Sequence, residues 1–211
     1  PSRRISYDPI RGMMTAQIPA NTDPAMSKPK VRLVATHGEI AKRARAARDS
    51  DGERLILVPV DFSAHSRAAL LHACELASAL PAAMVILHVV HDPGDMPGYY
   101  SKLIKKKRVG RIQDTAAQAF IEFIEDIIES HTNLPSLSNA EHLMVLGLPV
   151  TRILEVIDTV DPFLVVLGSQ GRTGLKHMLL GSKASQIVQL CPAPITVVKA
   201  KKPRASKDGA G

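Results

Sequence analysis

The sequence has 211 residues, of which 45% are apolar, so it can bury one substantial hydrophobic core. Its net charge of +7 is concentrated at the ends: residues 1–52 hold 10 Lys/Arg against 5 Asp/Glu, and residues 199–211 hold 5 against 1. The segment between them holds 12 against 14 and is nearly neutral, which argues against a nucleic-acid-binding fold.

The composition also predicts the cellular compartment. No apolar run approaches the roughly 20 residues of a membrane span, and the N-terminus lacks the apolar core of a secretory signal. The two cysteines, Cys74 and Cys191, each lie in an apolar run without paired spacing, as is typical of core residues in a reducing compartment. We therefore expect a cytoplasmic protein that does not span a membrane.

Residues 1–52 are predicted to form a basic, largely disordered extension, because five prolines and scattered charges interrupt any hydrophobic period. Within this extension, residues 39–48 contain good helix formers and fit either a short, basic, exposed helix or a solvated linker. Residues 201–211 are predicted to form a second basic, disordered tail. The folded domain is expected to span residues 53–200.

The domain is expected to begin with two buried strands and a helix between them. Residues 54–60 and 84–90 are apolar apart from Arg54 and His88, which is typical of strands covered on both faces. Ser63 is placed to cap the intervening helix, whose apolar residues recur at core spacing up to Pro81.

Strands and helices continue to alternate along the chain. The patterns predict a helix at 111–130, a strand at 142–146, a helix from Pro149, a strand at 163–167, a helix at 182–190 and a fifth strand that begins with Pro194 and ends with Val198. Five such alternations predict one α/β domain, with a parallel sheet that has helices on both faces.

A glycine-rich segment follows the fourth strand. Gly168, Gly171 and Gly174 come after five apolar residues, and a helix opens at Gly181 and Ser182. Glycine lets the backbone approach a ligand closely, and the first amides of a helix have no partner within the helix. A strand, a glycine turn and a helix start together favour a phosphate-binding site, where valine at Gly168 is expected to fill the phosphate space without unfolding the domain.

Asp61 is expected to form the opposite wall of this site. If the strand order is 3-2-1-4-5, the first and fourth strands are neighbours where the order reverses, and ligands bind at that edge. Asp61 then faces Gly168, and its carboxylate can accept hydrogen bonds from ribose hydroxyls or the adenine amine. Backbone groups near Val89 can contact the base, while the Ser182 hydroxyl and the Lys183 charge can contact phosphates.

Other chemistries find less support in the sequence. The spacing of Gly174, Gly181 and Lys183 does not fit a P-loop, and no set of His, Cys, Asp and Glu residues completes a metal site. The serines at 63, 169 and 182 have no base or orienting acid in the sequence pattern, so no catalytic residue is predicted. Each glycine and Asp61, taken alone, is also explained as a turn residue; their joint arrangement favours a pocket.

These motifs resemble the universal stress protein family. The spacing Gly168-x2-Gly171-x9-Gly181-Ser182 is similar to the nucleotide-binding signature of that family. Further similar segments are Val58-Pro-Val-Asp61-Phe-Ser63, Leu87-His-Val89, Gly147-x-Pro149 and the closing run from Cys191 to Val198. The resemblance covers about residues 53–200.

The resemblance implies a Rossmann-like, open, five-stranded parallel sheet in the order 3-2-1-4-5, in a homodimer paired through the last strand. It implies an ATP-binding member, with Mg²⁺ held through the phosphates. By position, the residues that contact the nucleotide are Pro59, Asp61, Val89, Gly168, Gly171, Gly181 and Ser182. Lys183 departs from the small or β-branched residue expected there and can either strengthen or crowd phosphate binding.

The leading functional hypothesis is an ATP-binding regulatory module of the stress response that acts as a nucleotide-dependent dimer. One alternative is an enzyme that uses the same pocket for slow ATP hydrolysis or autophosphorylation. Another is a dimeric scaffold whose basic tails bind nucleic acid or acidic partners. Since aromatic residues make up only 3% of the chain, such contacts would depend on phosphates and salt.

Overall fold

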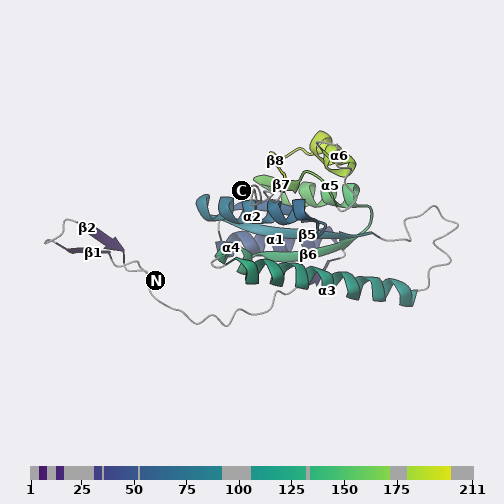
Figure 1. Ribbon diagram of the computed structural model, residues 1–211, viewed down its shortest axis with the longest axis horizontal. Coiled ribbons are helices and arrows are strands. Elements are labelled where there is room, and N and C mark those ends of the chain that lie inside the picture. The colour runs from purple at the N-terminus through teal and green to yellow at the C-terminus, as the bar shows by residue number, and fades with distance from the viewer. Residues whose placement is uncertain are drawn as a thin grey trace, which may run out of the picture.

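A parallel sheet of six strands forms the centre of the structure (Figure 1). This computed structural model describes residues 5–8, 13–16, 31–34, 36–51, 53–91, 106–131, 134–171 and 180–200. The strand order is β3 (Val31–Leu33), β6 (Glu141–Leu146), β5 (Ala82–Val90), β4 (Arg54–Val60), β7 (Leu164–Gly168) and β8 (Ile195–Val198). A separate antiparallel pair joins β1 (Ile5–Asp8) to β2 (Met13–Ala16).

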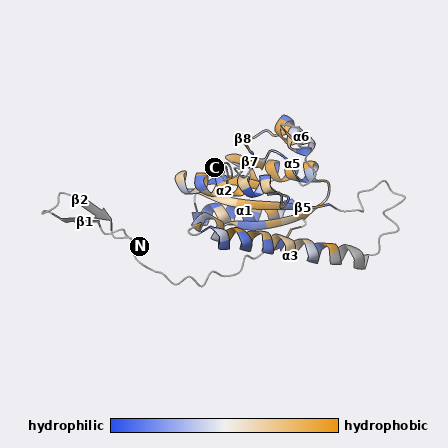
Figure 2. Ribbon diagram, in the orientation of Figure 1, coloured by the Kyte–Doolittle hydropathy of each residue, from blue (hydrophilic) through white to orange (hydrophobic). Residues whose placement is uncertain are grey.

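Strand β4 shows why its sequence is an unbroken apolar run. Ile56 and Val58 belong to the hydrophobic cluster on one face of the sheet, whereas Leu55 and Leu57 belong to the cluster on the other. Successive side chains of a strand point to opposite faces, so a strand covered on both faces has no polar positions. Figure 2 shows the neighbouring strand β5 mostly in the colour of hydrophobic residues.

Three helices cover each face of the sheet (Figure 1). One layer consists of α2 (Ala64–Ala79), α3 (Lys106–Ser130) and the short α4 (Pro135–Ser138). The other layer consists of α1 (His37–Asp51), α5 (Pro149–Val160) and α6 (Ser182–Leu190). The prediction of an α/β fold with helices on both faces is confirmed.

The five predicted strands have the predicted order 3-2-1-4-5, which corresponds here to β6-β5-β4-β7-β8. The predicted number of strands is wrong, because β3 adds a sixth strand that pairs in parallel with β6. Strand β3 has only three residues, of which Arg32 and Leu33 are exposed, so its sequence carries no strong strand pattern. Strand β3 therefore covers β6, which would otherwise be the edge strand of the sheet.

Helix α1 lies within residues 1–52, which were predicted to form a largely disordered extension before a domain that begins at residue 53. It is longer than the candidate helix at 39–48, and its side chains at Ile40, Ala44 and Ala47 are buried in the core. The small alanines lie between charged residues, so the buried stripe produces little hydrophobic signal. Arg48 donates from Nη2 to the carbonyl oxygens of Val160 (2.5 Å) and Asp161 (2.9 Å), at the end of α5. Residues 37–51 thus belong to the domain.

Several local predictions match the structure. Strand β4 and helix α6 have the predicted bounds, and Pro149 is the first residue of α5. Ser63 caps α2, since its Oγ accepts the backbone N–H of Ser66 at 3.1 Å. Phe163, expected within a buried strand, is 46% exposed and precedes β7. Gly174 and the predicted tail 201–211 lie outside the described residues.

Over the part of the chain that the structure describes, none of the helices combines the length and the apolar content needed to cross a bilayer.

Candidate functional site

The carboxyl ends of β4 and β7 lie side by side and bring Asp61 to the glycine loop. A Cβ atom added to Gly171 would lie 2.6 Å from Oδ2 of Asp61. Since real Cβ atoms do not approach an oxygen so closely, the carboxylate occupies the space that any larger residue at 171 would need. The structure therefore joins Asp61 to the glycine loop, through Gly171.

The Asp61 carboxylate is oriented by its own loop. Its Oδ1 accepts the backbone N–H of Ser63 at 3.2 Å, an Asx-turn contact. The residue between them, Phe62, has φ 63°, in the left-handed region that larger residues rarely adopt. After this turn the half-buried carboxylate of Asp61 lies next to Gly171, in the loop after β7, and the chain continues into Ser63, the N-cap of α2.

Phe62 anchors this strained loop in an aromatic cluster. Its ring stacks on His88 with centroids 4.2 Å apart, and it also contacts Phe123 of α3 at 5.3 Å. His88 is held in turn, because its Nδ1 lies 2.9 Å from the carbonyl oxygen of Val60 and donates to it. The position of Asp61 thus depends on β5 and α3. The sequence pattern singled out neither Phe62 nor His88, because their contact arises from strand pairing.

Gly168 has a structural role that the sequence did not predict. A Cβ atom there would lie 2.8 Å from the backbone carbon of His65 and 2.8 Å from the backbone nitrogen of Ser66. The end of β7 therefore passes against the first turn of α2, and a side chain would displace that backbone. Because helix α2 closes this space, we now expect valine at 168 to destabilise the domain as well as to affect the site.

Gly181 places the start of α6 against the glycine loop. Its backbone N–H donates to the Ser169 carbonyl at 2.8 Å, and a Cβ there would meet the Cα of Gln170 at 3.4 Å. Gly181 is the N-cap of α6 and offers no side-chain cap, so the first amides of the helix need other partners. Ser182 and Lys183 follow with exposed side chains. This helix start fits an anion.

Ser169 connects the loop to its surroundings and was not among the predicted site residues. It is only 1% exposed, and its backbone N–H donates to the Val198 carbonyl at 2.8 Å. Its Oγ lies 3.0 Å from Nδ1 of His65. The next carbonyl, that of Gln170, accepts the Ser63 hydroxyl at 3.3 Å. The first turn of α2 is therefore bonded to the loop at two successive residues.

This Ser169–His65 contact differs from the sequence-based view that Ser169 has no base. The pair is not arranged for nucleophilic attack, however, because the serine is buried. His65 Nδ1 also accepts the backbone N–H of Ala200 at 3.1 Å, so its one lone pair is shared between two donors and is not free to act as a base. The Ser169–His65 contact is therefore structural. Among the described residues, no group of three or more His, Cys, Asp and Glu side chains is placed to hold a metal ion.

Pro59 and Val89 lie on the α5 and α6 side of the sheet, where strand alternation puts them in phase with Leu57 and Leu87. Pro59 is buried within β4, so it offers little surface to a ligand. Val89 is half-buried near the end of β5, and its backbone lies at the carboxyl edge. Of the two residues, Val89 is the more accessible.

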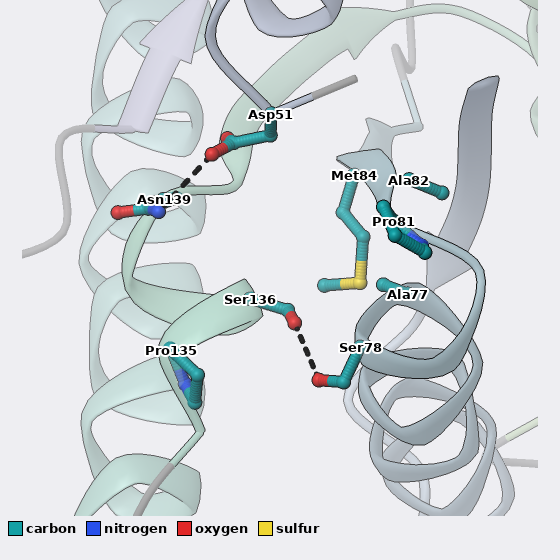
Figure 3. A pocket seen from close by; sticks show the side chains of 9 residues that line it. All are labelled: Asp51, Ala77, Ser78, Pro81, Ala82, Met84, Pro135, Ser136 and Asn139. Carbon is teal, nitrogen blue, oxygen red and sulfur yellow. Dashed lines mark hydrogen bonds between the residues drawn. The ribbon is translucent and has the colours of Figure 1, made fainter. Parts of the chain in front are cut away.

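Two cavities formed by described residues lie at the opposite ends of the strands, where β4 and β5 begin. One, of about 280 Å³, lies between α2 and α4, where Ser78 bonds to Ser136 at 2.9 Å and Asn139 bonds to Asp51 at 3.1 Å (Figure 3). The other, of about 630 Å³, lies beside Arg54 and Phe163. Neither contains a predicted site residue, so we place the site by the Asp61–Gly171 contact.

The fold and the site define a Rossmann-like α/β domain with a glycine loop and a helix start at the point where strand order reverses. Comparison with known families makes the assignment specific. Residues 53–199 match the model of the universal stress protein family, and the chain belongs to this family.

Individual relatives agree with this assignment. The universal stress protein MJ0577 of Methanocaldococcus jannaschii is 25% identical over 153 residues, which cover 69% of this chain and 94% of the relative. A universal stress protein of Mycolicibacterium smegmatis is 31% identical over 168 residues, which cover 79% of this chain and 51% of the relative. The structure of UspA from Lactobacillus plantarum has a TM-score of 0.57 at 23% identity, over 69% of this chain and 97% of that one. This last likeness concerns the fold.

Proposed function

We propose that this universal stress protein binds ATP at the carboxyl edge between β4 and β7 and acts as a nucleotide-dependent, cytoplasmic module of the stress response. The observation that carries the proposal is the contact between Asp61 and Gly171, where a Cβ would lie 2.6 Å from the carboxylate. A glycine kept open beside an oriented carboxylate, next to a helix start, fits a ligand that carries both a ribose and phosphates.

Each part of the site has a distinct task in this proposal. Asp61 accepts hydrogen bonds from ribose hydroxyls or the adenine amine, while the backbone near Val89 contacts the base. Gly171 and Gly181 let the backbone approach the phosphates, and the first amides of α6 donate to them. The exposed Lys183 adds positive charge at the same helix start. Mg²⁺ is held through the phosphates and neutralises part of their charge.

We further propose that the protein is a homodimer paired through β8. This strand lies at the edge of the sheet, opposite the edge that β3 covers. Val197 on β8 is 38% exposed, and Leu190 at the end of α6 is 63% exposed. A second copy would bury these apolar side chains and pair the open edge of the strand. Because Ser169 bonds to Val198, the dimer edge and the nucleotide loop are one connected unit.

The test of the proposal is to denature the purified full-length chain and identify any released nucleotide by chromatography and mass spectrometry. We expect an adenine nucleotide, and we expect its amount to fall in an Asp61→Ala variant that retains the wild-type circular dichroism spectrum. The full chain is needed, since α1 and β3 belong to the domain. A preparation that releases no nucleotide and takes up none from millimolar ATP would contradict the proposal.

A further inference from the structure

Three separate parts of the chain meet at one side chain, that of His65 in the first turn of α2. Its Nδ1 accepts the backbone N–H of Ala200, which follows β8, at 3.1 Å. The Ser169 hydroxyl, which follows β7, lies 3.0 Å from the same nitrogen. These partners are 135 and 104 residues away in the sequence. One imidazole nitrogen thus holds the ends of two neighbouring strands against a helix.

The geometry fixes the protonation state that these contacts need. A backbone N–H can only donate, so Nδ1 of His65 must present its lone pair to Ala200. The proton of the neutral ring is then on Nε2, and the Ser169 hydroxyl also donates to Nδ1. A side chain at position 65 that offers no acceptor there loses both contacts.

Ser169 carries this contact into the nucleotide loop. Its carbonyl accepts the N–H of Gly181, the N-cap of α6, at 2.8 Å, and its own N–H donates to the carbonyl of Val198 at 2.8 Å. Since Ser169 is buried, it cannot exchange these partners for water without moving the loop. A change at His65 therefore reaches both the start of α6 and the end of β8.

We propose that His65 is a positioning residue whose Nδ1 acceptor holds the nucleotide loop and the end of β8 on α2. The effect on nucleotide affinity rests on the proposed function; the contact itself does not.

The first experiment measures the ATP dissociation constant of the full-length chain at pH 8 for wild type, His65→Asn and His65→Ala. Asparagine keeps an acceptor near the Nδ1 position. We expect His65→Ala to bind about fivefold more weakly than wild type, the effect of about one hydrogen bond, and His65→Asn to restore an affinity close to that of wild type.

A matched control is His72→Asn, on the same helix. The His72 side chain is 39% exposed and lies 3.5 Å from Glu75, away from the described loop contacts. It should bind ATP like wild type. A His65→Ala variant that binds as tightly as wild type, or a His65→Asn variant that binds as weakly as His65→Ala, would overturn the proposal.

The second experiment needs no nucleotide. Amide hydrogen exchange at Ala200, compared between proteins at one pH, should be slow in wild type and His65→Asn and at least about fivefold faster in His65→Ala. If the Ala200 amide behaves this way but neither the wild type nor any variant binds ATP, the contact is supported and the proposed function fails. If ATP binds but exchange at Ala200 is unaffected by His65→Ala, the inference fails and the proposed function stands.

Discussion

Gly171 and Asp61 share one space: a Cβ atom on the glycine would lie 2.6 Å from Oδ2 of the carboxylate. The two residues come from the loops after β7 and β4, more than 100 positions apart, and the parallel pairing of these strands brings them together. The neighbouring N-cap of α6 completes an arrangement of carboxylate, open backbone and helix start. This arrangement is the basis of the proposed nucleotide site.

The shared space makes a double-mutant cycle informative. Asp61→Ala should weaken ATP binding roughly tenfold or more, because hydrogen bonds to a charged group are lost. Gly171→Ala should have a similar effect on its own, since the methyl group displaces the carboxylate. In the Asp61→Ala background, however, Gly171→Ala should add little, because its methyl group fits where the carboxylate was. Strictly additive losses in titration calorimetry would show that the two residues act independently.

Gly168 should be essential for stability rather than for binding alone. Alanine there would meet the backbone of His65 and Ser66 at 2.8 Å, and we expect a loss of about 2–3 kcal/mol in the free energy of unfolding. Gly38→Ala in α1 is the control, since a Cβ there meets nothing within 4 Å. This control should be neutral or slightly stabilising. Urea denaturation measures both, and equal stabilities would refute the packing role of Gly168.

Helix α1 should contribute to domain stability. Ile40 is fully buried, so Ile40→Ala should cost about 2–4 kcal/mol. Arg48→Met should cost about 1–2 kcal/mol, because the carbonyls of Val160 and Asp161 lose their donor. Lys42→Ala, on the exposed face, should stay within about 0.5 kcal/mol of wild type. If all three variants unfold at the same urea concentration, α1 is not part of the cooperative domain.

His142 should make the fold sensitive to acid. It is 3% exposed, its Nε2 has no hydrogen-bond partner in the described structure, and burial lowers its pKa to about 4. The unfolded chain, with an ordinary histidine pKa near 6.5, binds the proton more tightly. The free energy of unfolding therefore has its full value above about pH 6.5 and falls by about 3 kcal/mol as the pH drops toward 4.

Denaturation curves at pH 7.5, 6 and 5 test this dependence. A His142→Leu variant should lose the part of the pH slope that this histidine causes, whereas the half-exposed His72→Asn should keep the wild-type slope. Identical slopes in wild type and His142→Leu would assign the acid sensitivity to other groups.

The strands and the glycine loop could be predicted because they depend on local signals, whereas the strand order was implied by the resemblance to the family. Continuous apolar runs marked the buried strands, and the spacing from Gly168 to Ser182 marked the loop and the helix start. Parallel pairing then determines which strand ends meet. These features follow from short stretches of sequence together with the topology of α/β sheets.

Other features could not be predicted because they depend on packing between distant residues. The buried face of α1 is built from alanines, which look like helix filler between charges. The contacts of His65 join residues more than 100 positions apart, and no periodicity marks them. The packing of Gly168 against the backbone of α2 could not be predicted either, because that neighbour lies about 100 positions away in the sequence.

Titration calorimetry of ATP into the full-length chain, in wild type and in Gly171→Ala, tests the central claim most directly. The backbone at Gly171 does not have a left-handed φ, and among the described residues the methyl group meets only the movable end of the Asp61 side chain, so the variant should remain folded. We expect saturable binding to wild type and roughly tenfold weaker binding, or more, to the variant. Equal affinity in the two folded proteins, or no binding to either at millimolar ATP, would contradict a nucleotide site between Asp61 and Gly171.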